Sequence, residues 1–218
     1  YNQAIKNINN LTNLEELHCT HSSILDIKNL HKLRILNASH SYDIKDIDNL
    51  VNLEILYCKG LCGIRDSNLK NLAKLKTLYA CNNKYIMDIN HLANLRVLLC
   101  SGYSSISDSS MKYLNNLRIL NAKRNGKIKK VDHFINLKEL YCGYNCGISD
   151  ENIKNLYNLE ILDASDNENI KNINHLVNLK KLYCTKDCGI SDENIMGLYN
   201  LQFLDSRLNN KITLNLSR

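Results

Sequence analysis

Apolar residues recur along this chain in one short phrase, Leu-x-x-Leu-x followed by a small residue, which occurs ten times. The phrase begins at Leu14, Leu33, Leu53, Leu75, Leu95, Leu117, Leu137, Leu159, Leu179 and Leu201. From Leu33 onward the spacing between these leading leucines alternates between 20 and 22 residues. A repeat of this length indicates a solenoid, in which each unit buries its apolar face only against its neighbours.

Within each phrase apolar and polar residues alternate, as they do over residues 139–143. A period of two is typical of a short strand with one buried face, so we expect one strand in each repeat. The residue eight places after the leading leucine is an asparagine in five repeats: Asn83, Asn125, Asn145, Asn167 and Asn209. We expect these asparagines to hydrogen-bond the backbone of their own and neighbouring turns.

The segments that return from one strand to the next are of two alternating kinds. The shorter kind has the pattern Ile-x-x-Ile-x-x-Leu, and the longer kind reads Gly-Ile-Ser-Asp-Glu-Asn-Ile over residues 147–153 and 189–195. Ser149 or Asp150 can cap a short helical turn, so the two extra residues of the longer kind predict a turn of helix there. We interpret the carboxylates of these segments as caps and first-turn charges. Leu214 and Leu216 are expected to add a last strand that covers the final repeat.

These patterns resemble the leucine-rich repeat family over nearly the whole chain. The short repeats are similar to its 22-residue class, and the long repeats are similar to its cysteine-containing class. Set in a background rich in Asn, Ile, Lys and Tyr and without proline, the mixture resembles leucine-rich repeat proteins of giant amoebal viruses.

The resemblance implies an α/β solenoid that forms one domain over residues 1–218. This would be a leucine-rich repeat horseshoe of about ten repeats of alternating 20 and 22 residues. A parallel sheet would line the concave face, and short helical or irregular returns would form the convex face.

The same resemblance places the residues two, four and six positions after each leading leucine on the concave face. We predict that binding residues lie there in two rows, with Tyr144 beside them. The rows contain Ile55, Val97, Ile119, Ile161 and Phe203, and Tyr57, Tyr79, Leu99, Tyr141 and Tyr183. Exposed apolar and aromatic rows often mark an interface. The alternative is that such residues are present because they favour strands and support one another across them.

Cysteine is frequent, with nine in the chain, and it occupies the sixth position of every second phrase. These five residues are Cys19, Cys58, Cys100, Cys142 and Cys184. Parallel strands lie about 4.8 Å apart, so residues two strands apart are separated by about 10 Å. A disulfide needs Cα atoms within about 7 Å. We therefore expect buried free thiols and a reducing compartment, namely the cytoplasm, or the host cytoplasm if the protein is viral.

Catalytic motifs are missing from the sequence. It contains no glycine-rich phosphate loop, no nucleophile elbow and no His-Glu-x-x-His, so we expect neither an enzyme nor a cofactor. His21 and His40 occupy equivalent positions in adjacent repeats, about 5 Å apart on paired strands. Without a tighter set of four ligands we expect no metal site. No apolar run is long enough to cross a membrane.

Three functions fit these observations, and the first is a protein–protein interaction module that binds a partner on the concave face. We expect that module to be a monomer, with a host protein as a candidate partner. The second is binding of nucleic acid or another polyanion through basic residues near the tyrosines: Lys59, Lys123, Arg124, Lys186 and Arg207. The acidic residues Glu16, Asp163, Asp166 and Asp205 on the same face disfavour nucleic acid. The third is a purely structural scaffold.

Overall fold

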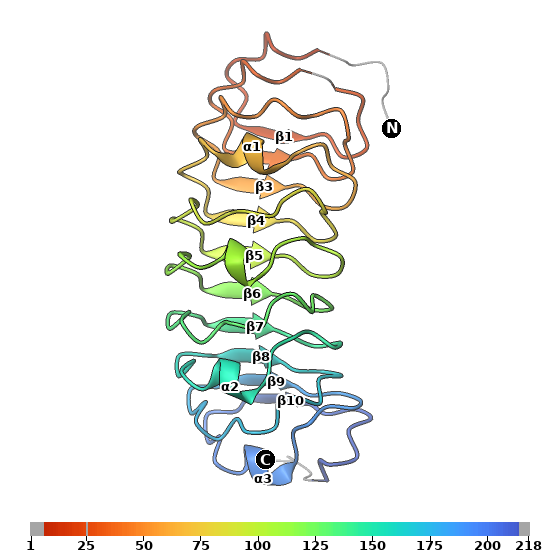
Figure 1. Cartoon of the computed structure of the whole chain (residues 1–218), viewed down its shortest axis with the longest axis vertical. Coiled ribbons are helices and arrows are strands. Elements are labelled where there is room, and N and C mark those ends of the chain that lie inside the picture. Colours follow the sequence, from red (N-terminus) through yellow and green to blue (C-terminus); the bar gives the residue numbers. More distant parts are fainter. Residues whose placement is uncertain (1–6, 25, 214–218) are drawn as a thin grey trace. The chain divides into compact units, whose positions relative to one another are not determined.

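Each of the ten phrases forms one three-residue strand, as predicted (Figure 1). The computed structural model describes residues 7–24 and 26–213, and the chain divides into two compact units, Tyr1–Leu117 and Arg118–Arg218. The first unit contains β1 (Glu16–His18), β2 (Ile35–Asn37), β3 (Ile55–Tyr57), β4 (Thr77–Tyr79) and β5 (Val97–Leu99). The second contains β6 (Ile119–Asn121), β7 (Glu139–Tyr141), β8 (Ile161–Asp163), β9 (Lys181–Tyr183) and β10 (Phe203–Asp205).

Within each unit the strands pair in parallel and in chain order. Residues at the same place in successive repeats are partners, as Leu56 and Leu78 are in the first unit and Leu140 and Leu162 in the second. Side chains at one place in the repeat therefore form rows across the strands. The prediction of a parallel-strand solenoid is confirmed, whereas a single domain over residues 1–218 stays a prediction.

The core of each unit lies between the strands and the return segments. The first and fourth leucines of the inner phrases, such as Leu75 and Leu78, are completely buried. In the first and last phrases the corresponding leucines, Leu14 and Leu201 among them, are only half-buried. Each of these two phrases has a described strand on one side only, so less of its apolar surface is covered.

Helical turns occur only in the long returns among the described residues, as the sequence predicts. They are α1 (Asp66–Leu69), the 3-10 turn η1 (Asp108–Ser110), α2 (Asp150–Ile153) and α3 (Asp192–Ile195). Ser149 is the N-cap residue of α2, and the Asn152 side chain accepts hydrogen bonds from the Ser149 backbone N–H and hydroxyl, at 2.8 and 2.9 Å. Each turn has three or four residues, so no helix in the described part of the chain could cross a membrane.

Asp150, the first residue of α2, forms hydrogen bonds outside its own helix. Asp150 accepts hydrogen bonds from the backbone N–H groups of Lys171 and Asn172 in the next repeat, at 2.7 and 3.0 Å. Asp66 does the same for Met87 and Asp88. These carboxylates thus join neighbouring returns, a role that the interpretation as caps and first-turn charges did not include.

Four of the five asparagines that the sequence placed in one row occupy the same buried position. Asn83, Asn125, Asn167 and Asn209 are buried, but Asn145 is exposed and its φ is +57°, so its prediction was wrong. Its repeat is of the long kind, in which the buried position is the next residue, Cys146, as it is at Cys62 and Cys188 in two other long repeats. The expected last strand at Leu214 and Leu216 lies outside the described residues.

Candidate interaction surface

The strand face is the outward side of the sheet in each unit. We define it as the first and third residues of every strand and the residue two places after the strand. All predicted binding residues lie on this face or, for Tyr144, beside it. The half-buried ones are Ile55, Tyr57, Tyr79, Val97, Leu99, Ile119, Tyr141, Tyr144, Ile161 and Tyr183, and Phe203 is 44% exposed. Their role in binding stays a prediction.

In the first unit an aromatic pair lies at the centre of the strand face. The rings of Tyr57 and Tyr79 stack with centroids 4.2 Å apart and planes 10° apart. Lys59 Nζ lies 5.2 Å from the Tyr79 centroid and 6.0 Å from that of Tyr57. Burial, and secondarily the neighbouring Tyr57, raises the pKa of the Tyr79 hydroxyl. The pair is thus a flat aromatic surface with one cation beside it.

In the second unit Tyr141 is held by a polar contact on the same face. Its hydroxyl donates a hydrogen bond to Glu139 Oε2 at 2.8 Å. Burial, followed by this contact with the Glu139 carboxylate, raises the pKa of Tyr141. Further along the unit, the rings of Tyr183 and Phe203 lie with their centroids 5.1 Å apart. The sequence predicted these rows but not the contacts between their members.

Tyr144 is surrounded by cations. The Nζ atoms of Lys123 and Lys186 lie 5.8 and 5.3 Å from its ring centroid, and the guanidinium carbon of Arg124 lies 5.0 Å away. We call these four residues the Tyr144 cluster. Lys123 also forms an ion pair with the buried carboxylate of Asp163. All these distances fall within the roughly 6 Å over which a cation and an aromatic face attract each other.

A row of residues with a left-handed backbone conformation borders the strand face. The residue seven places after each leading leucine has a φ between 55° and 70°: His21, His40, Gly60, Asn82, Gly102, Arg124, Tyr144, Asp166, Lys186 and Leu208. This conformation turns the backbone N–H toward the next repeat, as in the 2.8 Å bond from Tyr144 to the Ser165 carbonyl. Gly60, Gly102 and Asn82 are the members that could have signalled this row from sequence, because glycine and, less strongly, asparagine favour positive φ.

His21 and His40 come together as expected, but in a geometry that does not suit a shared metal ion. Their rings stack at 4.7 Å with planes 5° apart, so the lone pairs of the ring nitrogens run parallel rather than converging on one point. A Cβ atom at Gly60 would lie 2.3 Å from the His40 ring, which shows how closely that ring covers the glycine. Across the described residues, no three His, Cys, Asp or Glu side chains gather to form a metal-binding group.

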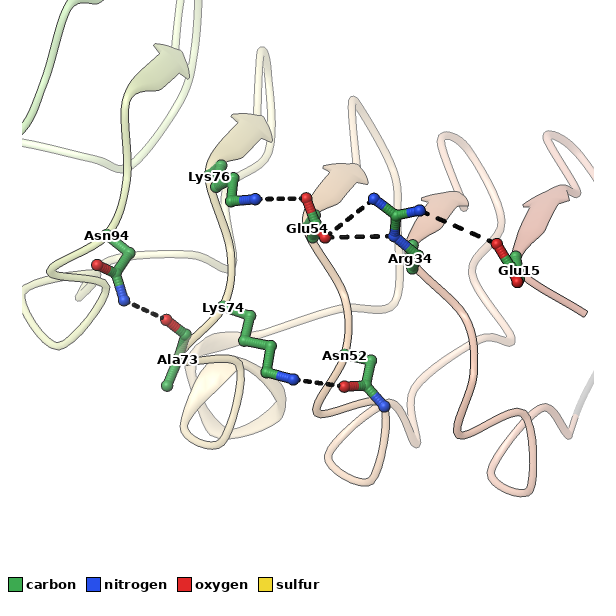
Figure 2. A network of polar contacts seen from close by, with 8 residues as sticks. All are labelled: Glu15, Arg34, Asn52, Glu54, Ala73, Lys74, Lys76 and Asn94. Carbon is green, nitrogen blue, oxygen red and sulfur yellow. Dashed lines mark hydrogen bonds and ion pairs between the residues drawn. The ribbon is translucent and has the colours of Figure 1, made fainter.

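Charged residues form a separate row before the strands, in the position directly after the leading leucine. Figure 2 shows this row in the first unit, where Arg34 lies between Glu15 and Glu54, and Lys76 contacts Glu54 at 2.7 Å. A second row runs alongside, in which Lys74 donates to the Asn52 side chain and Asn94 donates to the Ala73 carbonyl. Since each contact joins two repeats, both rows support the stack, and neither extends onto the strand face.

Eight of the nine cysteines are buried, which confirms their predicted place in the core, and Cys81 is half-buried. Burial is the main cause that raises the pKa of Cys19 to about 12 and that of Cys62 to about 11. These thiols remain protonated at neutral pH and behave as small apolar side chains.

The solved structures with a similar fold are solenoids. An internalin (inlF) from Listeria monocytogenes is 25% identical with a TM-score of 0.59, over 97% of this chain and 79% of the internalin. An internalin C2 (inlC2) from the same bacterium is 26% identical with a TM-score of 0.64, over 82% of each chain. TLR13, in a TLR13–ssRNA13 complex, is 22% identical with a TM-score of 0.63, over 94% of this chain and 34% of TLR13.

No protein-family model matches the chain, and no curated protein matches its sequence. The similarity to proteins of giant amoebal viruses stays a prediction. The ten in-register phrases, the parallel pairing within each unit and the likeness to the internalins agree with one another. The chain therefore has the leucine-rich repeat fold.

Proposed function

We propose that this protein is an interaction module whose strand face binds a protein partner. The observation that carries the proposal is the stacked pair of Tyr57 and Tyr79 with Lys59 beside it. Tyrosine offers a large, rigid contact area with a polar tip, which is why aromatic residues are enriched where partners bind tightly. Ile55, Val97 and Leu99 extend the apolar area around the pair and are half-buried.

The buried free thiols support a cytoplasmic location for this module. Free thiols that pack in the core persist where the surroundings keep them reduced. A host protein in that compartment is the candidate partner, and the module would act as a monomer without catalysing a reaction.

Binding of single-stranded nucleic acid is the second candidate, and two observations favour it. One is the group of cations around Tyr144, because basic and aromatic residues together suit single strands. The other is the similar fold of TLR13, which was solved with ssRNA13. Asp166 in the same unit counts against it, since its carboxylate forms no ion pair among the described contacts, whereas those of Asp163 and Asp205 are paired with Lys123 and Arg207.

The test substitutes one residue of the aromatic pair and a matched tyrosine elsewhere. Tyr57→Ala removes half of the pair, whereas Tyr113→Ala removes a tyrosine that is 57% exposed in a return segment and also has a lysine near its ring. Each immobilised protein would be exposed to a cytosolic extract, and the captured proteins would be quantified by mass spectrometry at low and high salt. Loss of an anchoring tyrosine typically costs about 1 to 2 kcal/mol, which corresponds to a roughly five- to thirtyfold weaker complex.

We expect Tyr57→Ala to lose proteins that Tyr113→Ala retains, with both variants melting close to the unsubstituted protein. Identical capture by the two variants would place the partner elsewhere on the molecule. RNA eluted from each immobilised protein would be quantified in parallel; if RNA alone is captured, and is released as the salt concentration rises, the second candidate is correct.

A further inference from the structure

The Tyr144 cluster points to a role in binding rather than in holding the fold together. Three cations share one aromatic ring, at 5.0 to 5.8 Å from its centroid. Like charges brought this close repel one another, and the ring offsets only part of that repulsion. An anion bound beside the ring would offset part of the remainder, so the arrangement favours a negatively charged ligand.

The backbone holds these side chains in place before any ligand arrives. Arg124, Tyr144 and Lys186 are all left-handed residues of the row that borders the strand face. Their N–H groups donate to carbonyl groups of the following repeats, those of Gly143, Ser165 and Arg207, at 2.8 to 3.2 Å. A preformed arrangement reduces the entropy lost when a ligand binds.

Gly143 permits the close approach of the two repeats beside Tyr144. A Cβ atom added there would lie 2.4 Å from the Ser165 carbonyl oxygen, so a larger residue would push the repeats apart. The position of Tyr144 relative to the next repeat therefore depends on the absence of a side chain at Gly143.

The charges of the cluster are not equally available. Lys123 is paired with the buried Asp163 carboxylate, so it acts mainly as a support for the ring. Arg124 and Lys186 are exposed and form no ion pair among the described contacts. Asp166 occupies the equivalent position in the repeat between Tyr144 and Lys186. The five residues Lys123, Arg124, Lys186, Asp163 and Asp166 carry three positive and two negative charges, a net charge of +1.

We propose that Arg124, Tyr144 and Lys186 form a subsite for one carboxylate side chain of the protein partner. This proposal deepens the proposed function and rests on it. A carboxylate that approaches the Tyr144 ring has beside it the two cations of the cluster that form no ion pair among the described contacts, Arg124 and Lys186. An extended polyanion would have to continue past Asp166, which forms no ion pair among the described contacts, whereas Asp163 and Asp205 are paired with Lys123 and Arg207. The charge pattern thus fits an isolated acidic residue better than a nucleic-acid strand.

A labelled peptide with one glutamate among neutral residues, titrated against the full chain and followed by fluorescence anisotropy, tests the subsite. Arg124→Gln and Lys186→Gln should each weaken binding by about two- to fivefold, the range of one exposed ion pair. Asp166→Asn should strengthen binding by a similar factor, because it removes the competing carboxylate; asparagine also tolerates the positive φ at this position. A purely structural role for these residues predicts no such gain.

Lys171→Gln is the matched control, since it removes the same charge from an exposed lysine in a return segment of the same unit. Equal affinity of all variants, or an equal loss with Lys171→Gln, would overturn the subsite and indicate attraction by net charge alone. Tighter binding of labelled oligouridylate that depends on Arg124 and Lys186 would overturn the carboxylate and identify a nucleic-acid site. If the peptide result is negative while Tyr57→Ala still loses captured proteins, the proposed function stands and only the subsite fails.

Discussion

Asn167 illustrates how a single buried polar residue joins two repeats. Its side-chain nitrogen donates to the carbonyl groups of Cys142 and Ile148 in the preceding repeat, at 2.9 and 3.1 Å, and its side-chain oxygen accepts from the Asn169 N–H at 3.0 Å. The residue is completely buried, so water cannot replace these partners. In the neighbouring long repeat a thiol occupies this place, and Cys146 Sγ lies 2.6 Å from the Cys142 carbonyl oxygen.

Asn167→Ala should therefore lower the free energy of unfolding by about 2 to 4 kcal/mol, because it leaves buried carbonyl groups without donors. Asn178→Ala is the control, since Asn178 is exposed and donates one 2.9 Å bond to the Tyr157 carbonyl, which water can replace. We expect that change to stay within about 0.5 kcal/mol. Urea denaturation measures both, and equal effects would contradict the role of burial.

At the scale of the elements, the helical turns connect the long returns to the short ones that follow them. Residue 150 is the first of α2, and its carboxylate accepts two backbone N–H groups of the next repeat. Asp66 and α1 repeat this arrangement in the first unit. A return segment without regular structure thereby gains partners for N–H groups that its own turn leaves free.

Asp150→Ala should lower the free energy of unfolding by about 1 kcal/mol, a value at the lower end for a charged acceptor because the site is partly exposed to water. Asp150→Asn should lose less, since its amide oxygen can still accept one of the two bonds. Glu151→Ala, which removes the next acidic residue of the same helix and its contact with Lys154, should change stability by less than about 0.5 kcal/mol. Thermal unfolding would rank the three variants, and a larger loss for Glu151→Ala would mean that the helix charge matters more than the contact between repeats.

At the scale of the whole molecule, ion pairs between repeats make the stability of the fold depend on pH. Hydrogen bonds from Lys138 and then Lys180 lower the pKa of Glu160 from 4.5 to about 2. In the first unit Lys76 and Arg34 lower the pKa of Glu54. Because the folded pKa lies below the unfolded value, protonation favours the unfolded chain. The stabilisation is present above about pH 4.5 and is lost as the pH falls toward 2.

Glu160→Gln should accordingly reduce stability at pH 7 and have little effect near pH 2, so the dependence on acid should be weaker in this variant. Urea midpoints measured at several pH values would show the difference. Glu168→Gln, which removes an exposed carboxylate in the same unit, should leave the acid dependence as it was. A parallel decline of the unsubstituted protein and Glu160→Gln would rule out this ion pair as a source of the pH dependence.

The sequence by itself determined the repeat, the strands, the rows on the strand face and the helical turns of the long returns. It could do so because leucines at a fixed period are all buried together only when the repeats stack in register. Ile55, Tyr57 and their equivalents followed from the same register. Ser149 and Asp150 marked the helix start through local capping chemistry, which the sequence contains directly.

Only the tertiary structure decided the contacts that run between repeats. The exposure of Asn145 and the burial of Cys146 appear only when neighbouring turns stack, because the spacing from Leu137 to Ile148 equals that from Leu159 to Ile170 in the next repeat. Tyr144 acquires its cations from residues that lie about 20 and 40 positions away in the chain. The left-handed conformation of Arg124 and Lys186 arises because their N–H groups bond to the next repeat, and neither residue type signals it. Local pattern thus specified each repeat, whereas the chemistry of the surface depended on which side chains the stacking brought together.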